Sequence, residues 1–291
     1  MSWIFFTMLA VVMQTFRNAL QSKLSAQVNT SGVTLARFLF APPIVAVYLY
    51  ALHLWQPQSL PTFNSSFLTF VSFAAVMQIV ATSLMVVLFK QKNFAIGAGL
   101  AKSEALVAGV LGTLFFGSSL SSLGWAGIFV GAIAVFVLSG WGKNGQLSLK
   151  TALIGLACGA SFALTSLFVR EASLVLDVPF PFSAAWVLLW VLCLQTLMLG
   201  IYIGYREPET FSQLKRQRWM TIATSLTSCL GSIGWFSAMA LQHVAYVKTL
   251  GQTEVLLTII ISALWLKNPV SKAELYGLLL IAIAAVMVMW G

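Results

Sequence analysis

Ten long apolar runs follow one another along the chain, and they constrain the fold more than any other feature. Each run has 19 to 24 residues and is joined to the next by a short connection. A helix needs about 20 predominantly apolar residues to cross the hydrocarbon core of a bilayer. The runs are continuous rather than alternating, which excludes a membrane β-barrel. They predict ten spanning helices, over residues 3–23, 32–52, 67–89, 94–116, 122–140, 150–170, 182–205, 219–242, 244–266 and 272–290.

The composition agrees with an all-α integral membrane protein. With 59% hydrophobic and 8% charged residues, the chain has too few polar groups to cover a soluble globule of its size. The sequence contains no Gly-x-x-x-x-Gly-Lys-Ser/Thr loop, no Ser/His/Asp set and no two-histidine metal site. We therefore expect a protein that is not an enzyme, is not driven by nucleotide hydrolysis, and needs no cofactor or metal.

A weak internal repeat relates the two halves of the chain. Ala95–Gly140 aligns without gaps on Ala245–Trp290, at a constant offset of 150 residues and with 10 identities in 46 positions. Within this alignment Glu104 falls on Glu254. Each half contains five predicted helices, an odd number, so the second half starts on the opposite face of the membrane. We therefore predict two inverted five-helix repeats around a central cavity, over residues 1–141 and 150–291 with a linker over 142–149.

Basic residues are concentrated in one set of connections. With ten helices, 11 lysines and arginines lie in or beside loops on the side opposite the termini, whereas only Arg170 lies on the side of the termini. The positive-inside rule then places the basic loops in the cytoplasm and both termini outside. Because these residues are scattered over five short loops, the net charge of +9 indicates membrane topology rather than a nucleic-acid partner.

Two local features are expected to shape individual helices. Pro42-Pro43 must break or kink the second predicted helix, since neither proline can donate a backbone hydrogen bond. Gly127 and Gly131 have the four-residue spacing that lets another helix approach closely, so we expect them to lie at a packing contact.

Glu104 and Glu254 are the strongest candidates for function. Both lie about ten residues into a predicted helix, near the middle of the bilayer, where a charged group costs at least about 2.5 kcal/mol unless it is paired, protonated or facing water. At about 100° per residue, Lys102 and Glu104 point about 200° apart, so we expect Lys102 to snorkel toward the cytoplasmic interface. The glutamates then either bind substrate or protons, or form structural ion bridges, for example with Arg17 and Arg37.

Other polar and aromatic side chains inside the apolar runs are further candidates. Gln14, Arg17 and Asn18 share one face of the first predicted helix, and such a face does not point at lipid. Trp186, Trp190 and Trp235 lie deeper than the aromatic residues at helix ends, and they fit cavity lining and core packing equally well. We assign Glu104 and Glu254 as candidates for proton coupling as well as substrate binding. The full predicted substrate site is Gln14, Arg17, Asn18, Gln78, Glu104, Trp186, Trp190, Ser232, Trp235, Lys248, Gln252 and Glu254.

The chain resembles the ten-helix, EamA-like branch of the drug/metabolite transporter superfamily. The resemblance rests on the ten short-looped helices, the five-plus-five repeat, the Arg37-Phe38 pair and the two repeat ends, where a polar turn precedes a helix with Gly127 or Gly277. The sequence departs from the family where many members have a proline and this chain has Ser103-Glu104 and Thr253-Glu254. The resemblance implies a secondary transporter of the bacterial inner membrane, usually an exporter of small metabolites.

The charges inside the predicted helices narrow the expected substrate. Four basic residues against two acids favour a compound with a carboxylate or phosphate, while the glutamates can take an amine or a proton. The working hypothesis is proton-linked or exchange export of a small polar or zwitterionic, amino-acid-like metabolite by alternating access. Two alternatives stay open, namely efflux of lipophilic cations or drugs, and a lipid flippase or non-transporting membrane partner. The sequence also leaves open whether the protein is a monomer or a homodimer.

Overall fold

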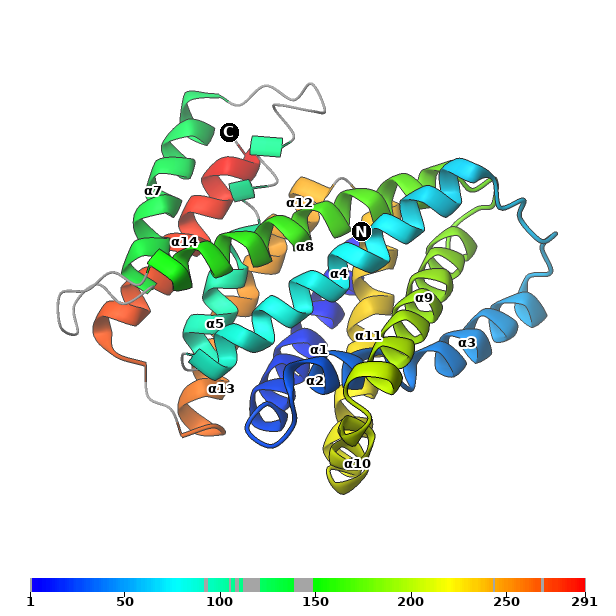
Figure 1. The fold of residues 1–291 in the computed structure, drawn as a ribbon. Coiled ribbons are helices and arrows are strands. Elements are labelled where there is room, and N and C mark those ends of the chain that lie inside the picture. Colours follow the sequence, from blue (N-terminus) through cyan, green and yellow to red (C-terminus); the bar gives the residue numbers. More distant parts are fainter. Residues whose placement is uncertain are drawn as a thin grey trace.

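The computed structural model describes residues 2–91, 94–104, 106–107, 110–111, 121–138, 149–242, 244–267 and 270–290. Within these ranges the chain is helical and contains no strand (Figure 1). A three-residue 3-10 turn, Gly251–Thr253, separates two of the helices. The helices are α1 (Ser2–Leu24), α2 (Thr30–Phe38), α3 (Ala41–Trp55), α4 (Ser65–Gln91), α5 (Phe94–Ala101), α7 (Ser122–Leu138), α8 (Leu149–Val175), α9 (Phe182–Arg206), α10 (Glu209–Arg216), α11 (Arg218–Leu241), α12 (Val244–Leu250), α13 (Glu254–Leu264) and α14 (Lys272–Trp290).

The predicted all-helical membrane class is confirmed for this part of the chain. By length and composition, five helical segments can cross a bilayer, and three shorter apolar helices accompany them. The helix α11 covers the predicted run 219–242 but carries several buried serines, which lower its apolar character. Most of the predicted linker and the turn at Gly117–Ser122 lie outside the described residues. The five long segments are Ser2–Leu24, Thr30–Trp55, Ser65–Gln91, Leu149–Val175 and Phe182–Arg206.

The predicted break at Pro42-Pro43 is confirmed. The helix α2 ends at Phe38, and α3 begins at Ala41 with prolines in its first turn, where a missing N–H costs nothing. Neighbouring helices satisfy the backbone groups that the break frees: Phe40 N donates to Ser225 Oγ at 2.9 Å, and Thr196 Oγ1 donates to Phe38 O at 3.2 Å. The break is therefore held in place by α9 and α11.

Two further helix breaks occur without proline, and here the prediction of continuous helices over 94–116 and 244–266 is wrong. The helix α5 ends at Ala101, Lys102 and Ser103 form a turn, and Glu104 is helical again. The turn is closed by short-range bonds, with Lys102 N donating to Gly99 O at 3.0 Å and Ser103 N donating to Leu100 O at 3.1 Å. In the second half, Gly251–Thr253 separates α12 from α13. Each glutamate thus stands where a helix resumes.

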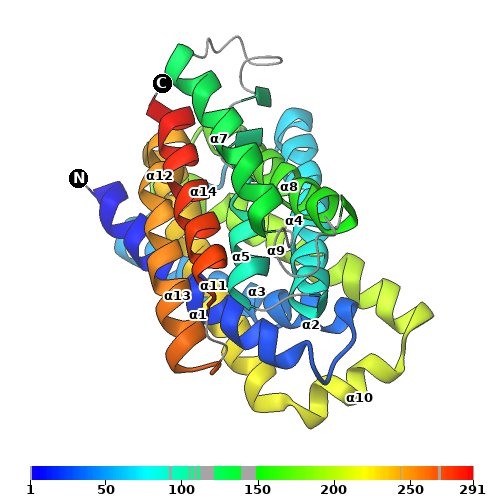
Figure 2. The same cartoon turned by 90° about the vertical axis from the view of Figure 1, so that its left-hand side faces the viewer.

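The most extensive packing contacts join helices that are distant in sequence. The helix α1 packs along α11, α4 along α8, and α7 along α14 (Figures 1 and 2). The predicted close contact at Gly127 is confirmed, because a Cβ atom there would lie 2.9 Å from Ala284 O on α14. Gly234 on α11 likewise lies against α1, where a Cβ atom would be 2.6 Å from Phe6 O. Glycine is needed at both positions because backbone atoms cannot move aside as side chains can.

Candidate functional site

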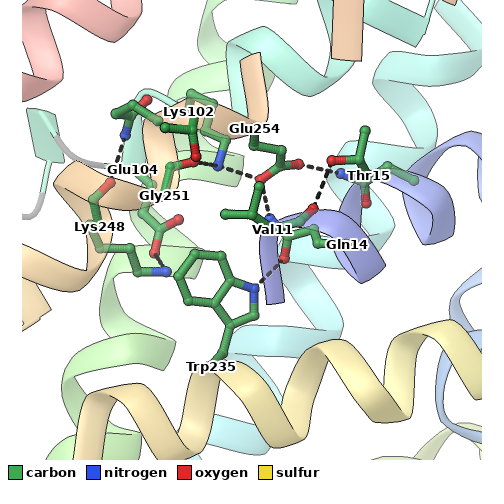
Figure 3. A network of polar contacts seen from close by, with 12 residues as sticks. Val11, Gln14, Thr15, Lys102, Glu104, Trp235, Lys248, Gly251 and Glu254 are labelled. Carbon is green, nitrogen blue, oxygen red and sulfur yellow. Dashed lines mark hydrogen bonds and ion pairs between the residues drawn. The ribbon is translucent and has the colours of Figure 1, made fainter. Parts of the chain in front are cut away.

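Two lysine–glutamate ion pairs cross between the halves of the chain at the helix breaks (Figure 3). Lys102 Nζ lies 2.5 Å from Glu254 Oε2, and Lys248 Nζ lies 2.6 Å from Glu104 Oε1. The four side chains are at most 11% exposed. Ion bridges of the glutamates are therefore present, but their cations are lysines of the opposite half, and the bridges expected with Arg17 and Arg37 are not formed.

Lys102 does not snorkel toward an interface, and this prediction is wrong. Its side chain is buried, and its Nζ also lies 3.4 Å from Gly251 O at the break of the second half. The prediction assumed one continuous helix through Lys102 and Glu104. Because the turn at Lys102–Ser103 interrupts that helix, both side chains line the same cavity.

The carboxylate of Glu254 accepts hydrogen bonds from α1 as well as the ion pair. Gln14 Nε2 lies 2.6 Å from Oε2, and Asn18 Nδ2 lies 3.0 Å from Oε1. Trp235 Nε1 on α11 in turn donates to Gln14 Oε1 at 2.8 Å, which fixes the orientation of that amide. Gln14 and Asn18 stand one turn apart, so the polar face predicted on the first helix points to Glu254. A buried carboxylate needs several such donors, because burial removes it from bulk water.

Glu104 is held by α8 and by Lys248. Ser166 Oγ donates to Glu104 Oε1 at 2.9 Å, a contact that the sequence did not reveal. Gly159 lets the break approach α8, because a Cβ atom there would lie 2.2 Å from Ser103 Oγ and 2.7 Å from Glu104 N. Lys248 Nζ also lies 4.6 Å from the ring centroid of Trp235, a distance that suits a cation–π contact. The two ion pairs thus share the wall formed by Trp235 and its hydrogen-bond partner Gln14.

Two arginines lie beside the ion pairs without a carboxylate of their own. Arg17 and Arg37 are 1% and 2% exposed. Arg17 donates from Nε and Nη2 to Asn18 Oδ1, at 3.1 and 2.7 Å, and Arg37 donates from Nη1 to Thr82 Oγ1 at 2.6 Å. The sequence indicated Arg37 as part of the pair with Phe38 and as a candidate ion-bridge partner of the glutamates, but the predicted substrate site did not include it.

These side chains surround a central cavity of about 40 Å³. A water molecule needs roughly 10–15 Å³ on this measure, so the cavity has room for about three water-sized groups in this conformation. A complete metabolite can enter only if the helices around the cavity separate. The cavity is lined by nine of the twelve predicted site residues, namely Gln14, Arg17, Asn18, Gln78, Glu104, Ser232, Trp235, Lys248 and Glu254.

Three predicted site residues lie outside this cavity. Trp186 and Trp190 stand on a face of α9 that packs against Phe63, with both ring centroids 5.3 Å from the Phe63 centroid. These contacts are core packing, and Trp186 in addition lines a separate pocket between α3 and α9. Gln252 lies in the 3-10 turn and donates from Nε2 to Lys248 O at 3.2 Å.

Another polar cluster joins the two halves at one end of the bundle, where α10 lies near the connection between α1 and α2 (Figures 1 and 2). Asn29 Nδ2 donates to Glu207 Oε2 at 2.7 Å and to Thr210 Oγ1 at 2.5 Å. Asn29 N donates to Gln213 Oε1 at 3.1 Å, and Ser31 Oγ donates to Glu207 Oε2. We call these five residues the polar latch. They connect α2 to α9 and α10, and none of them takes part in the central ion pairs.

Comparison with known proteins agrees with this architecture. The uncharacterized transporter YvbV of Bacillus subtilis (strain 168) is 22% identical over 192 residues, which are 64% of this chain and 59% of that protein. The chain therefore matches less than two thirds of that relative's length. A solved structure, titled only as the crystal structure of a protein, has a TM-score of 0.65 at 15% identity and covers 98% of this chain and 96% of its own. That likeness concerns the fold.

The second half of the chain carries the family assignment. Residues 149–290, just under half of the chain, match the EamA-like transporter family. This range runs from the start of α8 to the end of α14 and includes Lys248 and Glu254. The resemblance noted in the sequence is thereby supported: residues 149–290 match the EamA-like transporter family, and the chain has a weak relative that is named as an uncharacterized transporter.

Proposed function

We propose that this protein is a secondary transporter that exports small polar or zwitterionic, amino-acid-like metabolites by alternating access, driven by a proton gradient or by exchange. The observation that carries the proposal is the crossing of the two ion pairs, Lys102 with Glu254 and Lys248 with Glu104. Each pair joins the two halves at a helix break that lines the central cavity. In this proposal the halves are two inverted five-helix repeats, residues 1–141 and 150–291, in the inner membrane of a bacterium.

The pattern of helix packing supports the inverted repeat. An offset of 150 residues takes α1 onto α8, α4 onto α11, and α7 onto α14. Under this exchange the packed pair α1 and α11 becomes α8 and α4, which also pack together, and the pair α7 and α14 maps onto itself. A two-fold relation between repeats predicts this reciprocity. Such a relation also lets a small change in the packing of the halves open the cavity to one side and then the other.

The chemistry of the ion pairs supports coupling to substrate or protons. A buried ion pair adds little net stability over apolar residues of the same shape, whereas removal of one partner leaves a costly unpaired charge. A substrate amine or a proton that takes Glu254 releases Lys102, and the same competition at Glu104 releases Lys248. Loading of the site therefore weakens contacts between the halves. This link between occupancy and closure is what a secondary transporter requires.

Export of lipophilic cations receives less support. Such substrates are expected to bind an aromatic wall, and Trp186 and Trp190 pack against Phe63 instead of lining the cavity. Trp235 remains as the tryptophan of the cavity wall, and its ring already faces Lys248. A cation would have to compete with that ammonium group.

The proposal is tested by flux measurements on the purified protein in liposomes. A thermal-shift screen of metabolites first identifies a ligand, and its radiolabelled form is then followed under an imposed pH gradient. We expect gradient-dependent flux that falls at least about tenfold in Glu104→Gln and in Glu254→Gln, as removal of a charge-assisted contact predicts. Glu209→Gln, at the exposed start of α10, is the matched control and keeps the wild-type rate. Wild-type flux in both cavity variants would show that the glutamates have no coupling role.

A further inference from the structure

We infer that Arg17 and Arg37 form an anion-binding subsite in the central cavity, distinct from the two ion pairs, which takes the carboxylate or phosphate group of a net-anionic ligand. The inference deepens the proposed transport function and rests on it for treating the ligand as a substrate. It narrows the expected substrates from polar and zwitterionic metabolites in general to those that carry an excess of negative charge.

The charge of the cavity wall is the first observation. Its charged lining residues are four cations, Arg17, Arg37, Lys102 and Lys248, and two anions, Glu104 and Glu254. The formal net charge of this lining is therefore +2. Because each lysine is neutralised by a glutamate in an ion pair, the excess positive charge comes from the two arginines. Two like charges around one small, buried space repel each other, and an anion between them removes that repulsion.

Unused hydrogen-bond donors are the second observation. Among the described residues, Arg17 Nη1 and Arg37 Nε are buried and have no partner. Arg37 donates from Nη1 to a neutral hydroxyl, that of Thr82, and lines the cavity. Arg17 donates to the amide oxygen of Asn18, while the amide nitrogen of Asn18 turns to Glu254. Neither guanidinium therefore has the carboxylate partner that a buried arginine normally requires.

The chemistry of guanidinium selects the class of ligand. Its planar fork of N–H groups matches the two oxygens of a carboxylate or phosphate and forms paired, charge-assisted hydrogen bonds. A dianion such as a dicarboxylate or a phosphate monoester balances the formal excess of +2, whereas a neutral zwitterion leaves it unchanged. Within amino-acid-like compounds, the subsite favours those with an acidic side chain.

Equilibrium binding in detergent tests the inference without any transport measurement. Inorganic phosphate, succinate and alanine are titrated into the purified protein by calorimetry in a low-chloride buffer. We expect phosphate or succinate to bind saturably and at least about tenfold more tightly than alanine. Binding by phosphate alone identifies phosphate as the group, and binding by succinate alone identifies carboxylate.

Variants locate the subsite. Arg17→Gln and Arg37→Gln are each expected to weaken binding of the anion about 10- to 100-fold, the effect of losing a hydrogen bond to a charged group. Arg37→Lys keeps the charge but loses the fork, and it is expected to weaken binding less than Arg37→Gln. Arg218→Gln removes an exposed arginine at the start of α11 and is the matched control, with unchanged affinity.

Three results would overturn the inference: no saturable binding of either anion to the wild type, alanine binding as tightly as the anions, or equal loss in Arg218→Gln and Arg37→Gln. The first two need no variant, so the test stands even if an arginine substitution does not fold.

Failure of this inference can be distinguished from failure of the transport proposal. Saturable anion binding without flux in liposomes leaves the subsite and removes the transporter, whereas flux in liposomes without saturable anion binding removes the subsite and leaves the transporter.

Discussion

Lys102, in the helix break of the first half, lies 2.5 Å from Glu254, which begins the resumed helix of the second half. The reciprocal pair, Lys248 with Glu104, crosses in the other direction. The two lysines do not occupy equivalent positions, since Lys102 precedes Glu104 by two residues and Lys248 precedes Glu254 by six. The crossing therefore arises from the folded arrangement of the halves and not from a repeated Lys-Glu motif.

The pair of Lys102 and Glu254 is expected to show strong thermodynamic coupling. Lys102→Met and Glu254→Gln should each lower the free energy of unfolding by about 3–5 kcal/mol, because each leaves a buried charge or a polar group without its partner. The double variant should lose clearly less than the sum, and denaturation in detergent measures the difference. As a control, Lys102→Met combined with Glu207→Gln in the polar latch should be additive within about 0.5 kcal/mol. Additivity of Lys102→Met and Glu254→Gln would contradict the ion pair.

Gly159 is expected to be essential for the approach of α8 to the first helix break. Gly159→Ala places a methyl group 2.7 Å from Glu104 N and should destabilise the protein by about 1–3 kcal/mol through overpacking. Gly200→Ala on α9 is the matched control, since a Cβ atom there meets nothing within 4 Å. The control should be neutral or slightly stabilising, because alanine is the better helix former. Equal melting temperatures for the two variants would show that the break does not contact α8 as described.

Much of the helical layout could be predicted from the sequence, because lipid leaves the chain few ways to satisfy its backbone. The split at Pro42-Pro43 and the contact at Gly127 follow from residues whose backbone chemistry is distinctive. The breaks at Lys102–Ser103 and Gly251–Thr253 carry no such signal. They depend on side chains from α1, α8 and α11 that meet the broken segments only after packing.

The sequence predicted which residues form the candidate site better than it predicted how those residues are arranged. Glu104, Glu254 and the polar face of the first helix were found from depth and periodicity. The direction of Lys102 was wrong because it was derived from an unbroken helix. Trp186 and Trp190 were included because they lie far from the ends of their predicted spanning helix. That depth does not tell which side of α9 faces the cavity. Ser166 could not be distinguished from the other hydroxyl groups of α8 without the contact to Glu104.

The positive-inside rule gives a topology that labelling can check. In a variant without the native cysteines Cys158, Cys193 and Cys229, a cysteine at exposed Ser59 should react with a membrane-impermeant maleimide in intact cells. A cysteine at exposed Ser212 on α10, beside the basic residues of that helix, should react only after the cells are opened. Reversed labelling of the two positions would place the basic loops outside.

The proposed alternating access requires the polar latch to open, and a reversible cross-link tests that requirement most directly. In the cysteine-free variant, Asn29→Cys and Thr210→Cys replace two residues whose side chains lie 2.5 Å apart and which belong to opposite halves. Flux is measured in liposomes before oxidation, after formation of the disulfide, and after reduction. The account predicts transport that is abolished by the disulfide and restored by reductant, with no effect of oxidation on either single-cysteine variant. Transport at an undiminished rate with the disulfide formed would contradict movement of the two halves as the basis of function.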